Sequence, residues 1–228
     1  MNANKQDAMT IISTVKNALS EIGYPAKAIK TSQVRALSAA LFKQLEIQDI
    51  DSTLSVCETL LKQRDWACSI IAYDWAFKMR KQYTPETFTT FQHWLFTYVT
   101  DWNDCDDFCT HAFGELLLKY KALFPKILPW VNHDNFAVRR AMAVILIYPM
   151  NKKDYSDLSP LTVANLLQND EHYLVQKGYG WMLKVLSKHE PETVIKYLTQ
   201  HRSAMTRTAF RYALEKLDKT TQQKLMAL

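Results

Sequence analysis

The feature that most constrains this chain is a nearly fixed spacing between four stretches that resemble helix starts. Each stretch begins with an aspartate and places an aromatic residue one to three positions later. The successive spacings are 36, 33 and 36 residues, and the aspartates are Asp65, Asp101, Asp134 and Asp170. An aspartate carboxylate caps a helix by accepting the free amide hydrogens of the first turn. The spacing therefore predicts a repeat of helical hairpins.

Prolines mark further helix starts between these aspartates. They lie in TPET (84–87), LSPL (158–161) and EPET (190–193), and proline suits the first turn of a helix. The chain holds only 4 glycines and 7 prolines, too few for a sheet with many hairpins. We therefore expect an all-α fold of stacked HEAT-like helical hairpins, because the TPR consensus is absent. Such a stack is a curved α-solenoid with a concave face, and without a Ser/Gly-rich linker we expect one domain over residues 1–228.

Apolar side chains at helical spacing predict the core of two of these helices. Ile71, Trp75 and Met79 follow each other at intervals of four residues, so they share one helix face. A second apolar set is similarly spaced and is also expected in the core: Leu161, Val163, Leu166 and Leu167.

Composition and charge limit the class of protein. The start of the chain has no apolar signal segment, and the longest apolar run, residues 141–148, is too short to span a bilayer. The four cysteines show no disulfide spacing, so we expect a reducing cytoplasm. Residues 1–114 carry a net charge of −2 and residues 115–228 a net charge of +7. This asymmetry favours a polyanion partner for the second half, although an ordinary basic protein remains an alternative.

An acidic cluster in this basic chain is the main candidate for chemistry. The segment TDWNDCDDFC (100–109) places three carboxylates, Asp104, Asp106 and Asp107, just after Trp102. A metal site built from Cys105, Asp106, Cys109 and His111 is one interpretation. No second ligand pair occurs elsewhere, so we favour two buried thiols and expect no metal and no cofactor. The chain also lacks a glycine-rich phosphate loop and a GxSxG motif.

Several segments resemble one known family, the AlkD-like glycosylases of the DNA alkylation repair family, which are built of HEAT-like repeats. The resemblance covers about residues 28–217. It rests on AIKTSQVRALS (28–38), WNDCDDFC (102–109), DNFAVRRAM (134–142), LVQKGYGWMLK (174–184) and SAMTRTAFRYALEKL (203–217).

The resemblance implies a role for individual residues. The catalytic carboxylate corresponds to Asp106, the aromatic platform to Trp102 and Trp181, and a phosphate-binding arginine to Arg140. Asp107 matches no role and is expected to be a solvated neighbour. The chain departs from the family at Ala137, where relatives often carry tryptophan, and at Ala28, where a glycine is usual.

Basic residues of the second half are expected to face DNA. Arg207 and Arg211 are four residues apart and Lys177 and Lys184 seven, so each pair shares a helix face. Arg139 and Arg140 complete the set of candidates, and ordinary solvated charge is the alternative for all of them.

The resemblance therefore implies a DNA glycosylase, which we expect to be a monomer. It would release N3- or N7-alkylated purines from damaged duplex DNA, with no membrane association. One alternative is a helical-repeat DNA-binding protein of the same family that does not excise bases. A protein-binding repeat scaffold is a third, which the matching segments disfavour.

Overall fold

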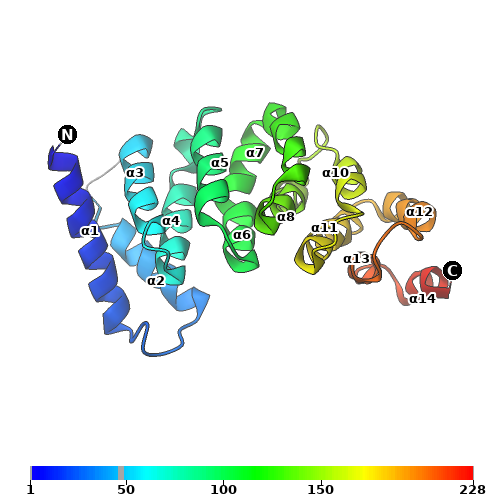
Figure 1. Cartoon of the computed structure of the whole chain (residues 1–228), viewed down its shortest axis with the longest axis horizontal. Coiled ribbons are helices and arrows are strands. Elements are labelled where there is room, and N and C mark those ends of the chain that lie inside the picture. Colours follow the sequence, from blue (N-terminus) through cyan, green and yellow to red (C-terminus); the bar gives the residue numbers. More distant parts are fainter. Residues whose placement is uncertain (1, 46–48, 228) are drawn as a thin grey trace. The chain divides into compact units, whose positions relative to one another are not determined.

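The computed structural model describes residues 2–45 and 49–227, and within them the chain forms helices and no strand. The expected all-α fold is thereby confirmed. The chain divides into two compact units, Met1–Tyr98 and Val99–Leu228, whose helices are labelled in Figure 1. None of the helices in the described residues is long and apolar enough to cross a membrane.

The first unit is built around α4. This helix packs against α2 and α3, and α1 packs against the same two helices. The indole of Trp75 is fully buried, and its Nε1 donates to the Ser38 carbonyl over 3.1 Å. The bounds are α1 Asn2–Glu21, α2 Thr31–Phe42, α3 Ile50–Leu61, α4 Trp66–Lys78, the 3-10 turn η1 Arg80–Gln82 and α5 Thr87–Tyr98.

The second unit holds the remaining helices. Their bounds are α6 Trp102–Phe108, the π-helical turn η2 Cys109–Phe113, α7 Gly114–Lys119, the 3-10 segment η3 Lys121–Asn132, α8 Phe136–Val144, α9 Ile147–Asn151, α10 Pro160–Leu167, α11 Tyr173–Leu186, α12 Pro191–His201, α13 Arg207–Leu214 and α14 Lys219–Ala227.

Four helices of the second unit form a row in the order α6, α8, α11 and α13, each packed against the next (Figure 1). On another side, α10 packs against both α8 and α11. Gly180 permits a close approach between α11 and α13. A Cβ at this position would lie 2.8 Å from the Ala209 carbonyl oxygen and 2.8 Å from Cβ of Tyr212. The row brings side chains from separate parts of the sequence together.

Two of the four predicted aspartate caps are confirmed and two are displaced. Asp65 caps α4 and Asp101 caps α6. However, α8 is capped by Asn135, whose Oδ1 accepts the Ala137 amide, and α11 is capped by His172. The predictions at Asp134 and Asp170 are therefore wrong by one and two residues. The repeat spacing located the helices, but asparagine and histidine also offer an acceptor to the first turn.

The prolines and the apolar pattern are largely as predicted. Pro160 and Pro191 are the first residues of α10 and α12, whereas Pro85 lies in a turn two residues before α5. The core set on α4 is buried. On α10 the prediction for Leu166 is wrong: this side chain is 40% exposed, because α10 turns only one face towards α8 and α11.

Candidate functional site

The acidic segment begins a run of helix that changes its winding part of the way along. Asp101 caps α6 through the Trp102 amide, and α6 continues through the π-helical turn η2 into α7. Thr110 donates its hydroxyl to the Asp106 carbonyl over 2.7 Å. Nδ1 of His111 lies 2.9 Å from the Asp107 carbonyl. These side chains occupy backbone acceptors where the wider turn interrupts the α-helical pattern.

Asp106 forms a two-point ion pair with Arg140. The Arg140 Nε donates to Oδ1 of Asp106 over 2.8 Å, and Nη2 donates to Oδ2 over 2.9 Å. The Arg140 side chain is only 5% exposed, and the Asp106 side chain is 19% exposed. The carboxylate is therefore the partner that faces solvent, and the guanidinium lies behind it.

A third helix fixes the position of Arg140. Its Nη1 donates to the Leu174 carbonyl at the start of α11. Gly178, one turn later, leaves the space that the arginine fills, since a Cβ there would lie 3.0 Å from Arg140 Cγ and 3.2 Å from Nη1. Arg140 thus links α6, α8 and α11, and its planar group holds the carboxylate in one orientation.

Burial and the ion pair have opposite effects on the titration of this pair. Burial raises the pKa of the Asp106 carboxyl above its ordinary value, and the hydrogen bonds and charge of Arg140 oppose that rise. For Arg140, burial alone would lower the pKa, but Asp106 more than offsets it and the pKa is raised. The guanidinium is therefore charged, and the carboxylate has lost much of its hydration.

The other carboxylates of the segment have different surroundings. Burial, with the charges of Asp101 and Asp107 added, raises the pKa of Asp104 to about 6. The Asp107 side chain is only 15% exposed, and its Oδ1 lies 3.6 Å from Nδ1 of His111. The expectation that Asp107 is a solvated neighbour is therefore wrong. Asp106 is the carboxylate of this group that is held by an arginine.

The two predicted platform tryptophans flank this pair along the row of helices. Trp102 lies one turn before Asp106 on α6 and is 42% exposed. Trp181 is half-buried on α11, three residues after Gly178, so it belongs to the face of α11 that receives Arg140. The structure places both residues on helices that contact α8, one on each side of it.

Ala137 is an interior residue rather than a wall of the site. It is fully buried, and its carbonyl lies 3.3 Å from the Cys105 sulfur, which donates to it. The neighbouring Phe136 is half-buried and stacks on the ring of His172 at 4.0 Å. Tyr173, which is 55% exposed, also stacks on His172, with 5.7 Å between the two ring centres. A partly exposed aromatic cluster therefore lies at the starts of α8 and α11.

Arg139 makes a different ion pair from its neighbour in sequence. Its Nε donates to Oδ2 of Asp170 over 2.6 Å, and Nη1 donates to the carbonyls of His133 and Asp134. These contacts join the loop before α8 to the loop before α11. Arg139, which we predicted to face DNA, is largely committed to this link.

The remaining predicted basic residues lie on α11 and α13. Lys177 and Lys184 both stand about 6.0 Å from the ring centre of Tyr212, so their shared face is confirmed. Lys184 also pairs with Glu215. Arg207 and Arg211 are exposed on α13. Among these residues the structure leaves Lys177, Arg207 and Arg211 without a carboxylate partner in the described chain.

Three contributors to the site were not predicted from the sequence: the Leu174 carbonyl, Gly178 and Tyr212. A signal for the glycine did exist. QKGYGW places two glycines inside a helix, where each is unfavourable by about 1 kcal/mol relative to alanine. Such a cost points to close packing at both positions, here against Arg140 and against α13.

The cysteines near the acidic segment are buried thiols. Cys105 and Cys109 are free and fully buried. Across residues 2–45 and 49–227, no cluster of three or more histidine, cysteine, aspartate or glutamate side chains is arranged to hold a metal ion.

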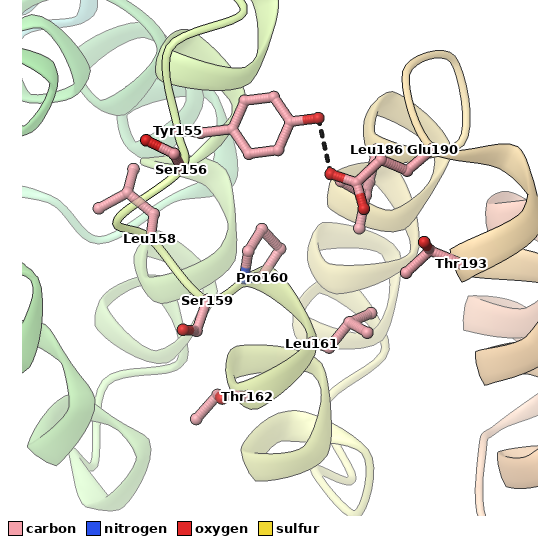
Figure 2. A pocket seen from close by; sticks show the side chains of 10 residues that line it. All are labelled: Tyr155, Ser156, Leu158, Ser159, Pro160, Leu161, Thr162, Leu186, Glu190 and Thr193. Carbon is pink, nitrogen blue, oxygen red and sulfur yellow. Dashed lines mark hydrogen bonds between the residues drawn. The ribbon is translucent and has the colours of Figure 1, made fainter.

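A separate cavity of about 330 Å³ lies where α10 and α12 begin (Figure 2). In Figure 2 the Tyr155 ring points across it, and its hydroxyl donates to Oε1 of Glu190 over 2.9 Å. Glu190 is the single charged residue among those that line this cavity. A wall whose charge is negative does not suit a DNA phosphate, and Asp106 is not part of it.

Comparisons with known proteins identify the family of this chain. The sequence profile of the family described as "DNA alkylation repair enzyme" matches residues 1–217. No curated protein matches the chain.

Solved structures give the fold independently. A protein from Enterococcus faecalis, described as a predicted DNA alkylation repair enzyme, is similar with a TM-score of 0.72 at 20% identity, covering 84% of this chain and 87% of that chain. AlkD2 from Streptococcus mutans has a TM-score of 0.65 at 17% identity, covering 91% and 99%. The smu.31 protein of Streptococcus mutans has a TM-score of 0.58 at 16% identity, covering 82% and 99%. With its family profile matched over almost the whole length, this chain belongs to the DNA alkylation repair enzyme family.

Proposed function

We propose that this protein is a DNA N-glycosylase that hydrolyses the bond between deoxyribose and N3- or N7-alkylated purines in duplex DNA. The observation that carries the proposal is the Asp106 carboxylate, 19% exposed and held at both oxygens by Arg140, one turn after the exposed Trp102. The protein would act as a monomer in the cytoplasm, without a cofactor. Its fold would be a curved HEAT-like solenoid.

The chemistry of the substrate fits a site built around a carboxylate, because it does not require a general acid. A purine alkylated at N3 or N7 is already positively charged, so its bond to C1′ is weakened. When that bond breaks, its electron pair moves to the base, which leaves neutral. The sugar becomes oxocarbenium-like and is attacked by water, which loses a proton.

Asp106 has two tasks in this scheme. Its fixed negative charge stabilises the cationic sugar, and a carboxylate oxygen orients the attacking water and accepts its proton. Trp102 and Trp181 offer ring faces, which attract cations and would receive the charged base or sugar.

The contacts of Arg140 favour a positioning role over the phosphate-binding role that the family resemblance implies. Three of its donors are used by Asp106 and the Leu174 carbonyl. Its side chain is only 5% exposed, so little of the guanidinium remains accessible to a phosphate. The phosphate contacts are better assigned to Lys177, Arg207 and Arg211. Contacts to phosphates carry no sequence information, which suits a protein that searches for damage.

A non-excising DNA-binding protein of the same family is the second candidate. The observation that favours it is the neutralised state of Asp106, whose charge is already balanced by Arg140.

The test is the release of free base from duplex DNA treated with a methylating agent, measured by chromatography of the purified wild-type protein's products. Binding of the same duplex is measured in parallel. Release of methylated purines supports the glycosylase. Binding without release selects the second candidate, and neither binding nor release excludes both.

A further inference from the structure

A second cavity in the second unit lies between the end of α12, the start of α13 and α14. Its volume is about 170 Å³, and it is lined by Arg202, Met205, Arg207, Phe210, Leu225 and Met226. It is separate from the Asp106 site, whose residues come from α6, α8 and the first half of α11.

The lining of this cavity combines an apolar floor with two cations. Met205, Phe210 and Leu225 are buried, and Met226 is 41% exposed at the edge. Arg202 and Arg207 are exposed, and neither side chain makes a hydrogen bond or ion pair within residues 2–45 and 49–227. Among the described residues no carboxylate lines this cavity, in contrast to the Glu190 cavity of Figure 2. The chemistry therefore suits an anion joined to an apolar group.

We propose that this cavity binds one sugar-phosphate unit of the DNA backbone. Arg202 and Arg207 would hold a single phosphate from two sides, with the adjoining deoxyribose against Phe210 and Met226. The volume corresponds to roughly five or six water molecules, which suits one such unit and is too small for several residues of a peptide. The inference rests on the proposed action on DNA and adds a contact remote from the reaction.

The position of the cavity in the fold supports DNA as the occupant. Arg207 opens α13, the helix whose Tyr212 lies beneath Lys177 and Lys184 of α11. Neighbouring helices pack at about 8–10 Å, so three steps along the row from α6 to α13 span roughly 25–30 Å. At 3.4 Å per base pair this is roughly eight base pairs, which is within reach of one duplex.

The experiment measures the affinity of the full chain for an undamaged duplex of about 20 base pairs as salt is varied. Arg202→Gln and Arg207→Gln should each weaken binding about tenfold and reduce the slope of log affinity against log salt by about one unit. Because both arginines share one phosphate, the double variant should also lose about one unit, not two. Met226→Ser should weaken binding about threefold at every salt concentration and leave the slope unchanged.

The control is Lys196→Gln, which removes an exposed cation of α12 that does not line the cavity. It should leave the slope unchanged. If Lys196→Gln reduces the slope as much as Arg202→Gln does, the effect comes from the total charge of the surface and not from this cavity. If the double variant loses two units of slope, the two arginines contact two separate phosphates. Unchanged binding in both arginine variants would assign the cavity to another kind of partner. Each of these results overturns the inference. Because the readout is binding to undamaged DNA, absence of base release would sink the proposed function without touching this result.

Discussion

Two consecutive arginines of α8 each pair with an aspartate from another segment, yet the two pairs differ in which partner meets solvent. In the pair with Asp106, the aspartate is 19% exposed and Arg140 is 5% exposed. In the pair with Asp170, Arg139 is 19% exposed and the aspartate is 8% exposed. The first pair presents a carboxylate and the second presents a guanidinium.

The other contacts of the two arginines explain this difference. Nη1 of Arg139 donates to carbonyls of the loop that precedes α8, so Arg139 links loops at the helix starts. Nη1 of Arg140 donates to the Leu174 carbonyl, and the side chain lies against Gly178. Arg140 is therefore buried between α6 and α11, and its carboxylate partner is the more exposed of the two. A similar ion pair can therefore link two loops in one place and, one residue later, support the proposed catalytic carboxylate.

The largest expected effect is a loss of base release when Asp106, but not Asp170, is replaced by asparagine. Asp106→Asn removes the charge that would face the cationic sugar, so base release under single-turnover conditions should fall by about 10²–10³. The variant should also lose about 1–3 kcal/mol of unfolding free energy, because Arg140 remains buried with only part of its hydrogen bonding satisfied. Binding of duplex DNA should be retained.

Asp170→Asn is the matched control, because it also breaks an arginine–aspartate pair in the second unit. It should lower the free energy of unfolding by a similar amount and leave base release within about threefold of wild type. Asp107→Asn, which changes the neighbouring residue, should likewise leave release nearly intact. Equal losses of release in all three variants would show that the acidic residues act only through stability.

Replacing each arginine by lysine keeps the charge and removes the planar fork. Arg140→Lys cannot reach both Asp106 oxygens and the Leu174 carbonyl, so unfolding free energy should fall by about 2–3 kcal/mol. Arg139→Lys should cost about 1 kcal/mol or less, since its side chain is more exposed than that of Arg140. Urea unfolding at pH 7, with the slope of the transition checked for constancy, measures both. A larger loss for Arg139→Lys would reverse the proposed ranking of the two pairs.

The sequence predicted helix positions better than it predicted contacts. Aspartates at a fixed spacing located four helices, but two of the caps turned out to be Asn135 and His172, because several side chains can accept a first-turn amide. Leu166 was expected in the core since hydrophobic spacing indicates a face without saying how much of that face is covered. The all-α class needed only the pattern and the scarcity of turn residues.

The sequence named residues for the candidate site but did not indicate their partners. Asp106, Arg140, Trp102 and Trp181 came from the resemblance to a family, and the structure puts them on three helices packed side by side. Arg140 pairs with Asp106 and Arg139 pairs with Asp170. This choice of partner depends on the different directions in which the two arginine side chains project from α8. Residues 34 and 31 positions away then become the partners, and no local spacing encodes that choice.

The third prediction concerns the support behind Arg140. Gly178→Ala puts a Cβ 3.0 Å from Arg140 Cγ, so the arginine must shift by a few tenths of an ångström and carry Asp106 with it. Base release should fall by about tenfold, because small misplacements of a positioned group are costly. Unfolding free energy should change by less than about 1 kcal/mol, since alanine's better helix propensity offsets the strain.

Gly180→Ala provides the opposite profile. Its Cβ would meet the Ala209 carbonyl and Tyr212 Cβ at 2.8 Å each, so α11 and α13 must move apart. We expect a loss of about 1–3 kcal/mol in unfolding free energy and a smaller effect on base release per folded molecule. If both glycine variants lose stability and release in the same proportion, Gly178 has no special relation to Arg140.

The smallest expected effect tests an aspartate that lacks an arginine partner. Burial and two neighbouring carboxylates raise the pKa of Asp104 to about 6, against 3.8 for the ordinary group. Between these pH values the folded chain binds more protons than the unfolded chain, so Asp104 lowers stability as pH rises from about 4 to 6. Asp104→Asn should therefore raise the unfolding free energy by about 1 kcal/mol at pH 7, a modest figure because the favourable first-turn helix dipole is lost with the charge. The gain should disappear at pH 4, where the wild-type group is protonated in the fold. Urea unfolding of both proteins from pH 4 to pH 8 measures the difference, and base release at pH 7 should be unchanged. A variant that is less stable at pH 7 would mean that the Asp104 charge is stabilised by its surroundings, as the Asp106 charge is by Arg140.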